Sequence, residues 1–330
     1  MDGAKPMRKP LMRLTFRQLQ VFEAVCEARS YSRAADIMAL TQPAVSLQVR
    51  QLEEVVGAPL FNYLNRTLYL TEAGEALRQT GRDLFARLGS LDMQLSNLRG
   101  ALHGQLRLGV ESSAQYLAPH LFSQFRSSHP QVNLALTVGN HVRVLRRLTE
   151  NREDVALMSV VPSGSDMEFL PLLDNAIVAV ARPGHALAGR KGLTLRELTA
   201  YPLLIREPGS GTRQACEDYL KQKRAHFVEQ LEIGAFEAQR EAVRAGLGLA
   251  LLPRQAIRSD LVAGSLIELD VAELPLRRSW CVVHPRGKPL SPVAQAFVDY
   301  LRSQRSLINA LGIALEPAAS AAPGAHPAAD

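Results

Sequence analysis

Residues 41–54 read Thr-Gln-Pro-Ala-Val-Ser-Leu-Gln-Val-Arg-Gln-Leu-Glu-Glu. Apolar side chains recur through this stretch and just beyond it with the spacing of one helix face, at Val45, Val49, Leu52 and Val56. Thr41 is expected to cap the helix, and Pro43 fits its first turn because a proline there gives up no hydrogen bond. Gly57 is expected to end it. The stretch therefore predicts an amphipathic helix with one buried face and one exposed polar face.

Two shorter helices are expected before this one, over residues 16–28 and 33–39, with Ser32 as the cap of the second. A short hairpin with a polar tip at residues 62–67 is expected after it. Three helices with a tight turn between the second and third, followed by such a wing, predict a winged helix-turn-helix domain over residues 13–71.

The exposed face of the third helix carries side chains that can read DNA. Gln pairs with adenine, Ser donates or accepts, Leu meets a thymine methyl group, and Arg reaches guanine or phosphate. The candidate base-reading residues are Gln42, Pro43, Ser46, Leu47 and Arg50. The candidates for contact with the DNA backbone are Ser32, Arg33, Thr41, Asn65 and Arg66. The other interpretation is a helical dimerisation domain with a solvated polar face. The basic excess here is modest, so the turn and the polar stripe, rather than charge, favour DNA.

A long helix is expected after Thr71, with Glu72 and Glu75 in the first turn, where acidic side chains suit the helix dipole. Leucines then follow at heptad spacing, at Leu77, Leu84, Leu88, Leu91, Leu95, Leu98 and Leu102. One interpretation is an amphipathic helix packed on its own domain. The regular seam favours dimerisation instead, so we expect a linker helix over residues 72–103.

After Gly104 short apolar strands alternate with helices, which predicts an α/β fold with a parallel sheet. We expect a two-lobed effector-binding module over residues 104–311. Its first lobe is expected to comprise residues 104–176 and 281–311, and its second lobe residues 177–280. Residues 312–330 are rich in Ala and Pro without periodicity and are expected to form a disordered tail.

A two-lobed α/β module binds its ligand in the cleft, where loops follow the strands. Residues 206–213, Arg-Glu-Pro-Gly-Ser-Gly-Thr-Arg, form a Gly/Ser-rich loop that leads into a helix between two arginines, a combination suited to phosphate or carboxylate. The other interpretation is a capping turn, with Thr212 as the cap and Arg206 in a surface ion pair. The expected cleft position favours a ligand. The candidate effector-binding residues are Ser112, Ser113, Gly139, Asn140, Arg206, Ser210, Gly211, Thr212 and Phe236.

Composition excludes several classes of protein. The chain has 330 residues, 47% apolar and 21% charged, with a formal charge of +6, so it is a globular protein of about two domains with a mild basic excess. The three cysteines lie too far apart for metal-ligand spacing and are expected to be buried. No apolar run approaches the ~18 residues needed to span a bilayer, and no export signal is evident. We therefore expect a cytoplasmic protein with no membrane partner.

Catalytic motifs are not evident in the sequence. Gly246-Leu-Gly-Leu-Ala resembles a dinucleotide fingerprint only superficially, because the third glycine is missing and a strand follows. The histidines have no paired spacing, and there is no nucleophile motif. We expect no enzyme activity, no catalytic residue, no metal and no cofactor. A solute-binding or enzymatic α/β module with an accessory helical domain is the second hypothesis, against which the lack of a leader and of catalytic groups argues.

Several motifs resemble the LysR-type transcriptional regulators, namely Phe16-Arg-Gln-Leu-Gln-Val-Phe, Ser32-Arg-Ala-Ala, Thr41-Gln-Pro-Ala-Val-Ser, Gln51-Leu-Glu-Glu and Leu70-Thr-Glu-Ala-Gly. The resemblance is specific in the first 75 residues and looser up to about residue 305. It implies a DNA-binding winged domain, a dimerising linker helix and an effector-sensing module like the type-2 periplasmic binding proteins. The implied partners are double-stranded promoter DNA, further copies of the chain in a dimer of dimers, a small anionic effector and RNA polymerase.

Residues 206–213 and Gly287-Lys-Pro-Leu-Ser-Pro-Val-Ala resemble the subgroup that controls the Calvin-cycle carbon-fixation (rubisco) operon. This resemblance implies a phosphorylated metabolite or the reduced nicotinamide nucleotide NADPH as effector. A regulator of another metabolic operon, with an unphosphorylated carboxylate as effector, is the alternative. The sequence departs from the family pattern at Arg29, where Gly is common, at Leu47, where a polar residue is common, and at Ala235-Phe236, where a Gly/Ser-Asn pair is expected.

Overall fold

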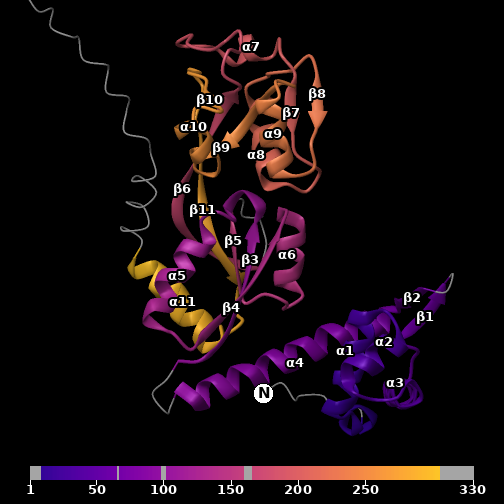
Figure 1. Ribbon diagram of the computed structural model, residues 1–330. Helices are drawn as coiled ribbons and strands as arrows, with labels where there is room; N and C mark the ends of the chain where they lie inside the picture. The colour runs from indigo at the N-terminus through magenta and orange to yellow at the C-terminus, as the bar shows by residue number, and fades with distance from the viewer. Residues whose placement is uncertain (1–8, 65–66, 98–101, 160–165, 305–330) are drawn as a thin grey trace, which may run out of the picture. The chain divides into compact units, whose positions relative to one another are not determined.

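The computed structural model describes residues 9–64, 67–97, 102–159 and 166–304 (Figure 1). The chain divides into two compact units, Met1–Gly89 and Ser90–Asp330. The predicted tail over residues 312–330 lies outside the described residues.

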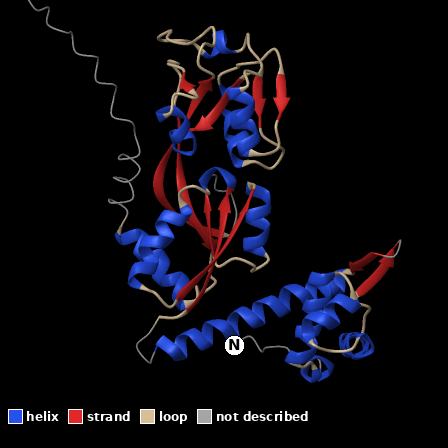
Figure 2. Ribbon diagram, viewed as in Figure 1, coloured by secondary structure: helices blue, strands red, loops and turns tan. Residues whose placement is uncertain are grey.

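The first unit contains the predicted helices and hairpin (Figure 2). In chain order its elements are η1 Lys9–Arg13, α1 Phe16–Ala28, α2 Tyr31–Met38, α3 Gln42–Val56, β1 Phe61–Leu64, β2 Thr67–Leu70 and the start of α4 Glu72–Asn97. Val45, Val49 and Leu52 of α3 are buried, as the periodicity predicts. Val45 and Val49 pack in a core that includes Ala34 and Ala35 of α2, and Leu52 packs with Phe22 of α1. The two strands pair antiparallel to form the wing.

The predicted caps of α3 are confirmed, whereas that of α2 is wrong. The Thr41 hydroxyl accepts a hydrogen bond from the backbone N–H of Ala44, and Gly57 ends α3 with φ +79°. However, α2 begins at Tyr31, and its cap is Ser30, which accepts from the N–H of Arg33. Ser32 lies inside the helix and is exposed. Helix α2 starts earlier than predicted because the chain turns sharply at Arg29, the residue before its cap Ser30.

Arg29 and Ala39 both adopt left-handed backbone conformations, with φ of 50° and 52°. Arg29 ends α1 and Ala39 ends α2, so each occupies a position at which helices commonly carry glycine. A side chain with a Cβ is strained in this region. The departure from the family pattern at Arg29 therefore places a residue with a Cβ at the left-handed backbone position that ends α1.

The helix α4 is capped and braced at its first turns. The Thr71 hydroxyl accepts from the N–H of Gly74 at 3.0 Å and donates to the carbonyl of Pro59 at 2.7 Å. Further along, Glu23 of α1 forms ion pairs with both Arg78 and Arg82 of α4, at 3.2 and 3.0 Å. These contacts hold the start of the linker helix against the winged domain.

The leucine seam of α4 is largely open to solvent in the single chain. Leu77 packs against the core of the winged domain. The next four leucines of the heptad pattern are 42–53% exposed, namely Leu84, Leu88, Leu91 and Leu95. Leu98 lies outside the described residues.

The second unit contains one mixed sheet. Its strands are β3 Gly104–Glu111, β4 Val132–Gly139, β5 Val155–Met158, β6 Met167–Ala181, β7 Leu203–Ile205, β8 Gln230–Glu232, β9 Leu249–Pro253, β10 Ile267–Glu268 and β11 Leu276–Pro285. They are ordered β4-β3-β5-β11-β6-β9-β7-β8, with β10 beside β6. Its helices are η2 Ser112–Ala114, α5 Ala118–Ser128, α6 His141–Thr149, α7 Leu195–Leu198, α8 Gly211–Gln222, α9 Phe236–Arg244, η3 Arg254–Ile257, α10 Arg258–Val262 and α11 Pro292–Ser303.

The predicted parallel sheet is only partly correct. Strands β4, β3 and β5 are parallel at one end, as are β8, β7 and β9 at the other. Between them β6 and β11 run antiparallel to their neighbours and to each other. The sequence pattern does not reveal the full length of β6, because polar residues and Pro171 interrupt its apolar residues in the first half of the strand.

The two long strands join two lobes, which lie at opposite ends of the sheet (Figure 1). Lobe I contains β3, β4 and β5 with α5, α6 and α11, and lobe II contains β7 to β10 with α7 to α10. The predicted lobe boundaries fall inside β6 and β11. A register shift between Trp280 and Cys281 lies at this crossing. Within the described residues no helix is long and apolar enough to cross a membrane.

Replacing Arg29 by Gly should raise the free energy of unfolding by about 0.5–1 kcal/mol, because Gly adopts the left-handed conformation without the Cβ strain. Denaturation of the full chain followed by circular dichroism measures the change. The matched control is Gly57→Ala, which places a Cβ at φ +79° with no atom within 4 Å and should destabilise by strain alone. Equal stability of Arg29→Gly and the parent chain would contradict the assignment of strain.

Candidate functional site

The candidate DNA-reading residues lie on the side of α3 that faces away from the core. Gln42, Pro43, Leu47 and Arg50 are exposed, and Ser46 is half-buried. Leu47 is 53% exposed, so an apolar side chain is presented on an otherwise polar surface. The Thr41 hydroxyl accepts the capping hydrogen bond of α3. The arrangement of α3 therefore matches the prediction, whereas the base contacts themselves stay a prediction.

Only some of the candidate residues for contact with the DNA backbone lie within the described residues. Ser32 and Arg33 are exposed on the first turn of α2. Asn65 and Arg66, at the tip of the wing, lie outside the described residues. Sequence reasoning missed the exposed aromatic residues Tyr63 and Tyr69, which the strand alternation of the wing could have revealed.

In the second unit Arg206 is the centre of the candidate effector site. It directly follows β7 and is only 3% exposed. Its Nε and Nη2 donate to the two carboxylate oxygens of Glu207 at 2.9 and 3.0 Å, and Nη2 also donates to Ser112 Oγ at 3.1 Å. The guanidinium lies 5.9 Å from the centre of the Phe236 ring. The remaining nitrogen, Nη1, is buried with no hydrogen-bond partner among the described residues.

An unpartnered buried guanidinium nitrogen is unfavourable, because the protein interior does not replace the water it has lost. Three of the predicted residues, Arg206, Ser112 and Phe236, come together around this group from both lobes. The aromatic ring of Phe236 occupies the place where the family pattern suggests an amide. It offers its face to the cation instead of a hydrogen bond.

Further contacts join the two lobes. Glu237 of lobe II accepts hydrogen bonds from Tyr116, at 3.0 Å, and from Gln115, both of lobe I. Burial raises the pKa of the Glu237 carboxyl, but these hydrogen bonds, its own backbone N–H and the charge of Arg206 outweigh it, so the pKa lies below its usual value. The N–H of Val142 also donates to the carbonyl of Gly209 at 3.3 Å. The cleft is therefore bridged beside Arg206.

Glu111, at the end of β3, is a functional candidate that the sequence did not single out. It is 2% exposed and accepts from Ser159 N and Oγ at 3.0 and 2.7 Å, with His141 Nδ1 2.7 Å from its other oxygen. A Cβ on Gly211 would lie 2.8 Å from this carboxylate, so only glycine fits there. Glu111 therefore brings the end of β3 against the start of α8.

Several predicted residues have structural roles in the cleft. Ser210, rather than Thr212, caps α8 by accepting from the N–H of Arg213, so the capping role considered for Thr212 is wrong. Asn140 caps α6 in the same way, through the N–H of Arg143. Thr212 is buried in the first turn of α8. Gly139 lies directly before Asn140, and a Cβ there would crowd the Arg143 side chain at 3.1 Å.

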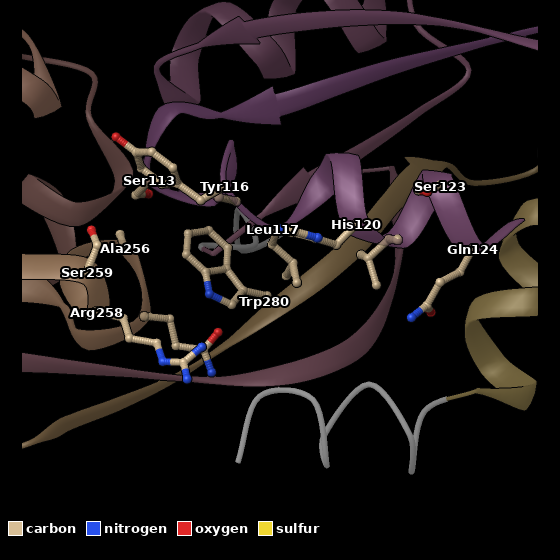
Figure 3. Close-up of a pocket in the computed structure, with 13 residues that line it drawn as sticks. Ser113, Tyr116, Leu117, His120, Ser123, Gln124, Ala256, Arg258, Ser259 and Trp280 are labelled. Carbon is tan, nitrogen blue, oxygen red and sulfur yellow. The ribbon is translucent and has the colours of Figure 1, made fainter. Parts of the chain in front are cut away.

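A cavity of about 460 Å³ lies between the lobes at α5 and α10 (Figure 3). Figure 3 shows Trp280 of β11 at the centre of the cavity. Leu117, which directly precedes α5, and His120 of α5 lie on one side of it, and Arg258 of α10 lies on another. Ser113 lines this cavity, whereas its neighbour Ser112 contacts Arg206. Of the two adjacent serines, Ser113 therefore lines the cavity and Ser112 lies at the candidate effector site.

The cysteines are buried, as predicted. Burial raises the pKa of both the Cys26 and the Cys216 thiols to about 12. Both thiols are therefore protonated at neutral pH and are poor nucleophiles. Within the described residues, no three His, Cys, Asp or Glu side chains lie together in a way that could hold a metal ion.

Comparison with known proteins identifies both units. Residues 16–75 match the model of the bacterial regulatory helix-turn-helix protein, lysR family, and residues 99–306 match the LysR substrate binding domain. A RuBisCO operon transcriptional regulator of Allochromatium vinosum is 39% identical over 90% of this chain and 99% of its own length. A CbbR regulator of Rhodospirillum rubrum is 40% identical over 87% of this chain and 95% of its own.

A solved structure is also similar to the second unit. The regulatory domain of CcmR from Synechocystis PCC6803, in complex with 2-PG, is 34% identical, with a TM-score of 0.59 over 61% of this chain and 97% of that one. The fold of full-length CbnR in complex with its target DNA covers 88% of this chain and 99% of that one, with a TM-score of 0.65 at 20% identity.

Replacing Glu111 by Gln should lower the free energy of unfolding of the second unit by about 1.5–3 kcal/mol, because the amide cannot accept at both positions and loses a charge-assisted bond. Urea denaturation followed by the fluorescence of Trp280, the single tryptophan, reports on this unit. Glu229→Gln, a change at an exposed carboxylate, is the matched control and should have little effect. A loss below about 0.5 kcal/mol would show that the Glu111 contacts contribute little.

Proposed function

Because the chain belongs to the LysR family of transcriptional regulators, we propose that it controls a carbon-fixation operon in response to a small phosphorylated metabolite. The observation that carries the effector proposal is the buried Nη1 of Arg206, which has no partner among the described residues. The similarity to RuBisCO operon regulators over most of the chain supports the choice of operon.

Three features of the cleft support an anion as the ligand. Arg206 lies 3% exposed between the lobes, where its charge interacts strongly with a second charge. Ser112 supplies a hydroxyl 3.1 Å from Nη2 of Arg206. Helix α8 begins five residues after Arg206, and its first-turn N–H groups favour negative charge. A phosphate group satisfies all three features, and the 2-PG bound by the similar CcmR domain supports this class of ligand.

The ligand is expected to act through the angle between the lobes. Its anionic group contacts residues of both lobes, so it stabilises one relative orientation over another. NADPH carries phosphate groups as well and belongs to the same chemical class. An unphosphorylated carboxylate is the competing effector, and the thermal-shift experiment below separates the two classes.

The winged domain is proposed to bind promoter DNA through α3. Gln42, Ser46, Leu47 and Arg50 would reach base edges, and Arg33 on α2 the sugar-phosphate backbone. The exposed leucines of α4 supply an apolar stripe that a second copy of the chain can cover. Two such dimers would form the tetramer that bends the promoter and contacts RNA polymerase in the cytoplasm.

Phosphorylated ligands should stabilise the protein against heat. A ligand at about 100 times its dissociation constant adds about 2.7 kcal/mol to the free energy of unfolding. A thermal-shift panel on the full chain compares 2-phosphoglycolate, phosphoenolpyruvate, ribulose bisphosphate and NADPH with succinate and benzoate. The shift should disappear in Arg206→Gln and persist in Arg196→Gln, which removes an exposed arginine elsewhere in lobe II. A shift with unphosphorylated carboxylates alone would overturn the phosphate proposal.

Replacing Arg50 by Ala should weaken operator binding about 5- to 100-fold and relax the preference at one base pair, since a bidentate base contact is worth about 1–3 kcal/mol of discrimination. Gel retardation with operator variants at fixed salt measures both effects. Arg196→Ala, the control, removes the same charge from the second unit, which carries none of the proposed DNA-contacting residues. Equal weakening on every sequence would instead assign Arg50 to a phosphate contact.

A further inference from the structure

The guanidinium of Arg206 is already paired within its own loop. Glu207 accepts from Nε at 2.9 Å and from Nη2 at 3.0 Å, so both carboxylate oxygens lie along one edge of the guanidinium. This two-bond geometry is the one that a ligand carboxylate would adopt. An anion that enters the cleft therefore meets Glu207 in the position that it would itself occupy.

The other carboxylates around the cleft have different partners. Glu111 is bound by Ser159 and His141, and Glu237 accepts from Tyr116 and Gln115. Glu232 accepts from Arg213 at 2.8 Å. Glu207 is thus the carboxylate that pairs directly with Arg206 among the described residues.

We propose that Glu207 sets the effector specificity of this protein, because it competes with incoming anions for Arg206 and admits a phosphate dianion while excluding a simple monocarboxylate. The proposal rests on the function proposed above, in which Arg206 holds the anionic group of the effector.

A free monocarboxylate gains little by replacing Glu207. It offers the same two oxygens and the same single charge, so the exchange creates no stronger bond at Arg206. Glu207 is the next residue in the chain and is present at a high effective concentration. The free ligand also loses translational and rotational freedom on binding. Exchange of one carboxylate for another is therefore unfavourable.

A phosphate monoester can overcome this competition. It carries a charge of about −1.5 to −2 at pH 7 and three acceptor oxygens. Two oxygens can take the edge that Glu207 vacates, and the third can reach another donor. The hydroxyl of Ser112 is such a donor, because it can donate its proton while its oxygen accepts from Nη2 of Arg206.

The burial of the two partners indicates which of them moves. The Glu207 side chain is 21% exposed, whereas the Arg206 side chain is 4% exposed. A displaced Glu207 carboxylate can turn into water and recover its hydration. Arg206 is fixed beneath it by Phe236 and by Ser112 of the other lobe. Displacement therefore exposes the Glu207 carboxylate to solvent and leaves the Arg206 guanidinium in place.

Isothermal titration calorimetry of the full chain with 2-phosphoglycolate and glycolate tests the proposal, since these ligands differ by one phosphate. In Glu207→Gln the dissociation constant for glycolate should fall at least tenfold, and that for 2-phosphoglycolate should fall by less. The ratio of the glycolate constant to the 2-phosphoglycolate constant therefore decreases. Glu207→Asp, whose shorter side chain reaches Arg206 less well, should show a smaller change in the same direction. This second variant decides the question if the first does not fold.

The matched control is Glu229→Gln. Glu229 is an exposed carboxylate of lobe II, directly before β8, and is not among the residues placed around Arg206. Its replacement should change either dissociation constant less than twofold. An equal gain in Glu229→Gln would assign the effect to overall charge and overturn the proposal.

The remaining outcomes separate this proposal from the proposed function. Unchanged or weaker binding in Glu207→Gln, with binding still lost in Arg206→Gln, overturns the role of Glu207 and leaves the effector site intact. Binding of 2-phosphoglycolate that survives Arg206→Gln overturns the effector site. Binding of neither ligand to any variant overturns both.

Discussion

The cleft depends on one buried cation. The guanidinium of Arg206 is almost completely removed from water, and a charge in that position is stable only with close partners. Glu207 supplies the opposite charge, Phe236 supplies an aromatic face, and Ser112 supplies a hydroxyl from the other lobe. The loop that carries Arg206 is held in turn by Arg213, which donates to the Arg206 carbonyl at 2.8 Å. The contacts between lobes beside it are arranged around this charge.

The winged domain could be predicted in detail because its determinants are local. The cap at Thr41, the apolar period from Val45 to Leu52 and the stop at Gly57 act within one or two helical turns. The error at Ser32 has the same origin. Two serines, Ser30 and Ser32, lie close together, and the left-handed turn at Arg29 selects the first as the cap. Nothing in the residue types distinguishes them without that backbone conformation.

The sheet and the cleft could be predicted only in part, because their determinants are far apart in the sequence. Alternating strands and helices indicated an α/β unit, but the antiparallel course of β6 and β11 is a property of the assembled sheet. The loop at residues 206–213 was identified from its composition. The contact between Glu111 and the start of α8 joins residues about one hundred positions apart, and no local pattern marks that carboxylate. Contacts at this separation follow from packing rather than from spacing.

The connection between the lobes makes their relative orientation depend on the contacts at Arg206. The chain passes between the lobes only in β6 and β11 within the described residues, and β11 changes register at Trp280 where the strands cross. Two strands resist bending less than a continuous core does. The orientation of the lobes is therefore sensitive to the few side-chain contacts across the cleft, from Ser112 to Arg206 and from Tyr116 to Glu237. A ligand changes that orientation only by binding one arrangement of these contacts more tightly than another. An anion that displaces Glu207 does so, because it replaces a bond within lobe II by one that can also reach lobe I.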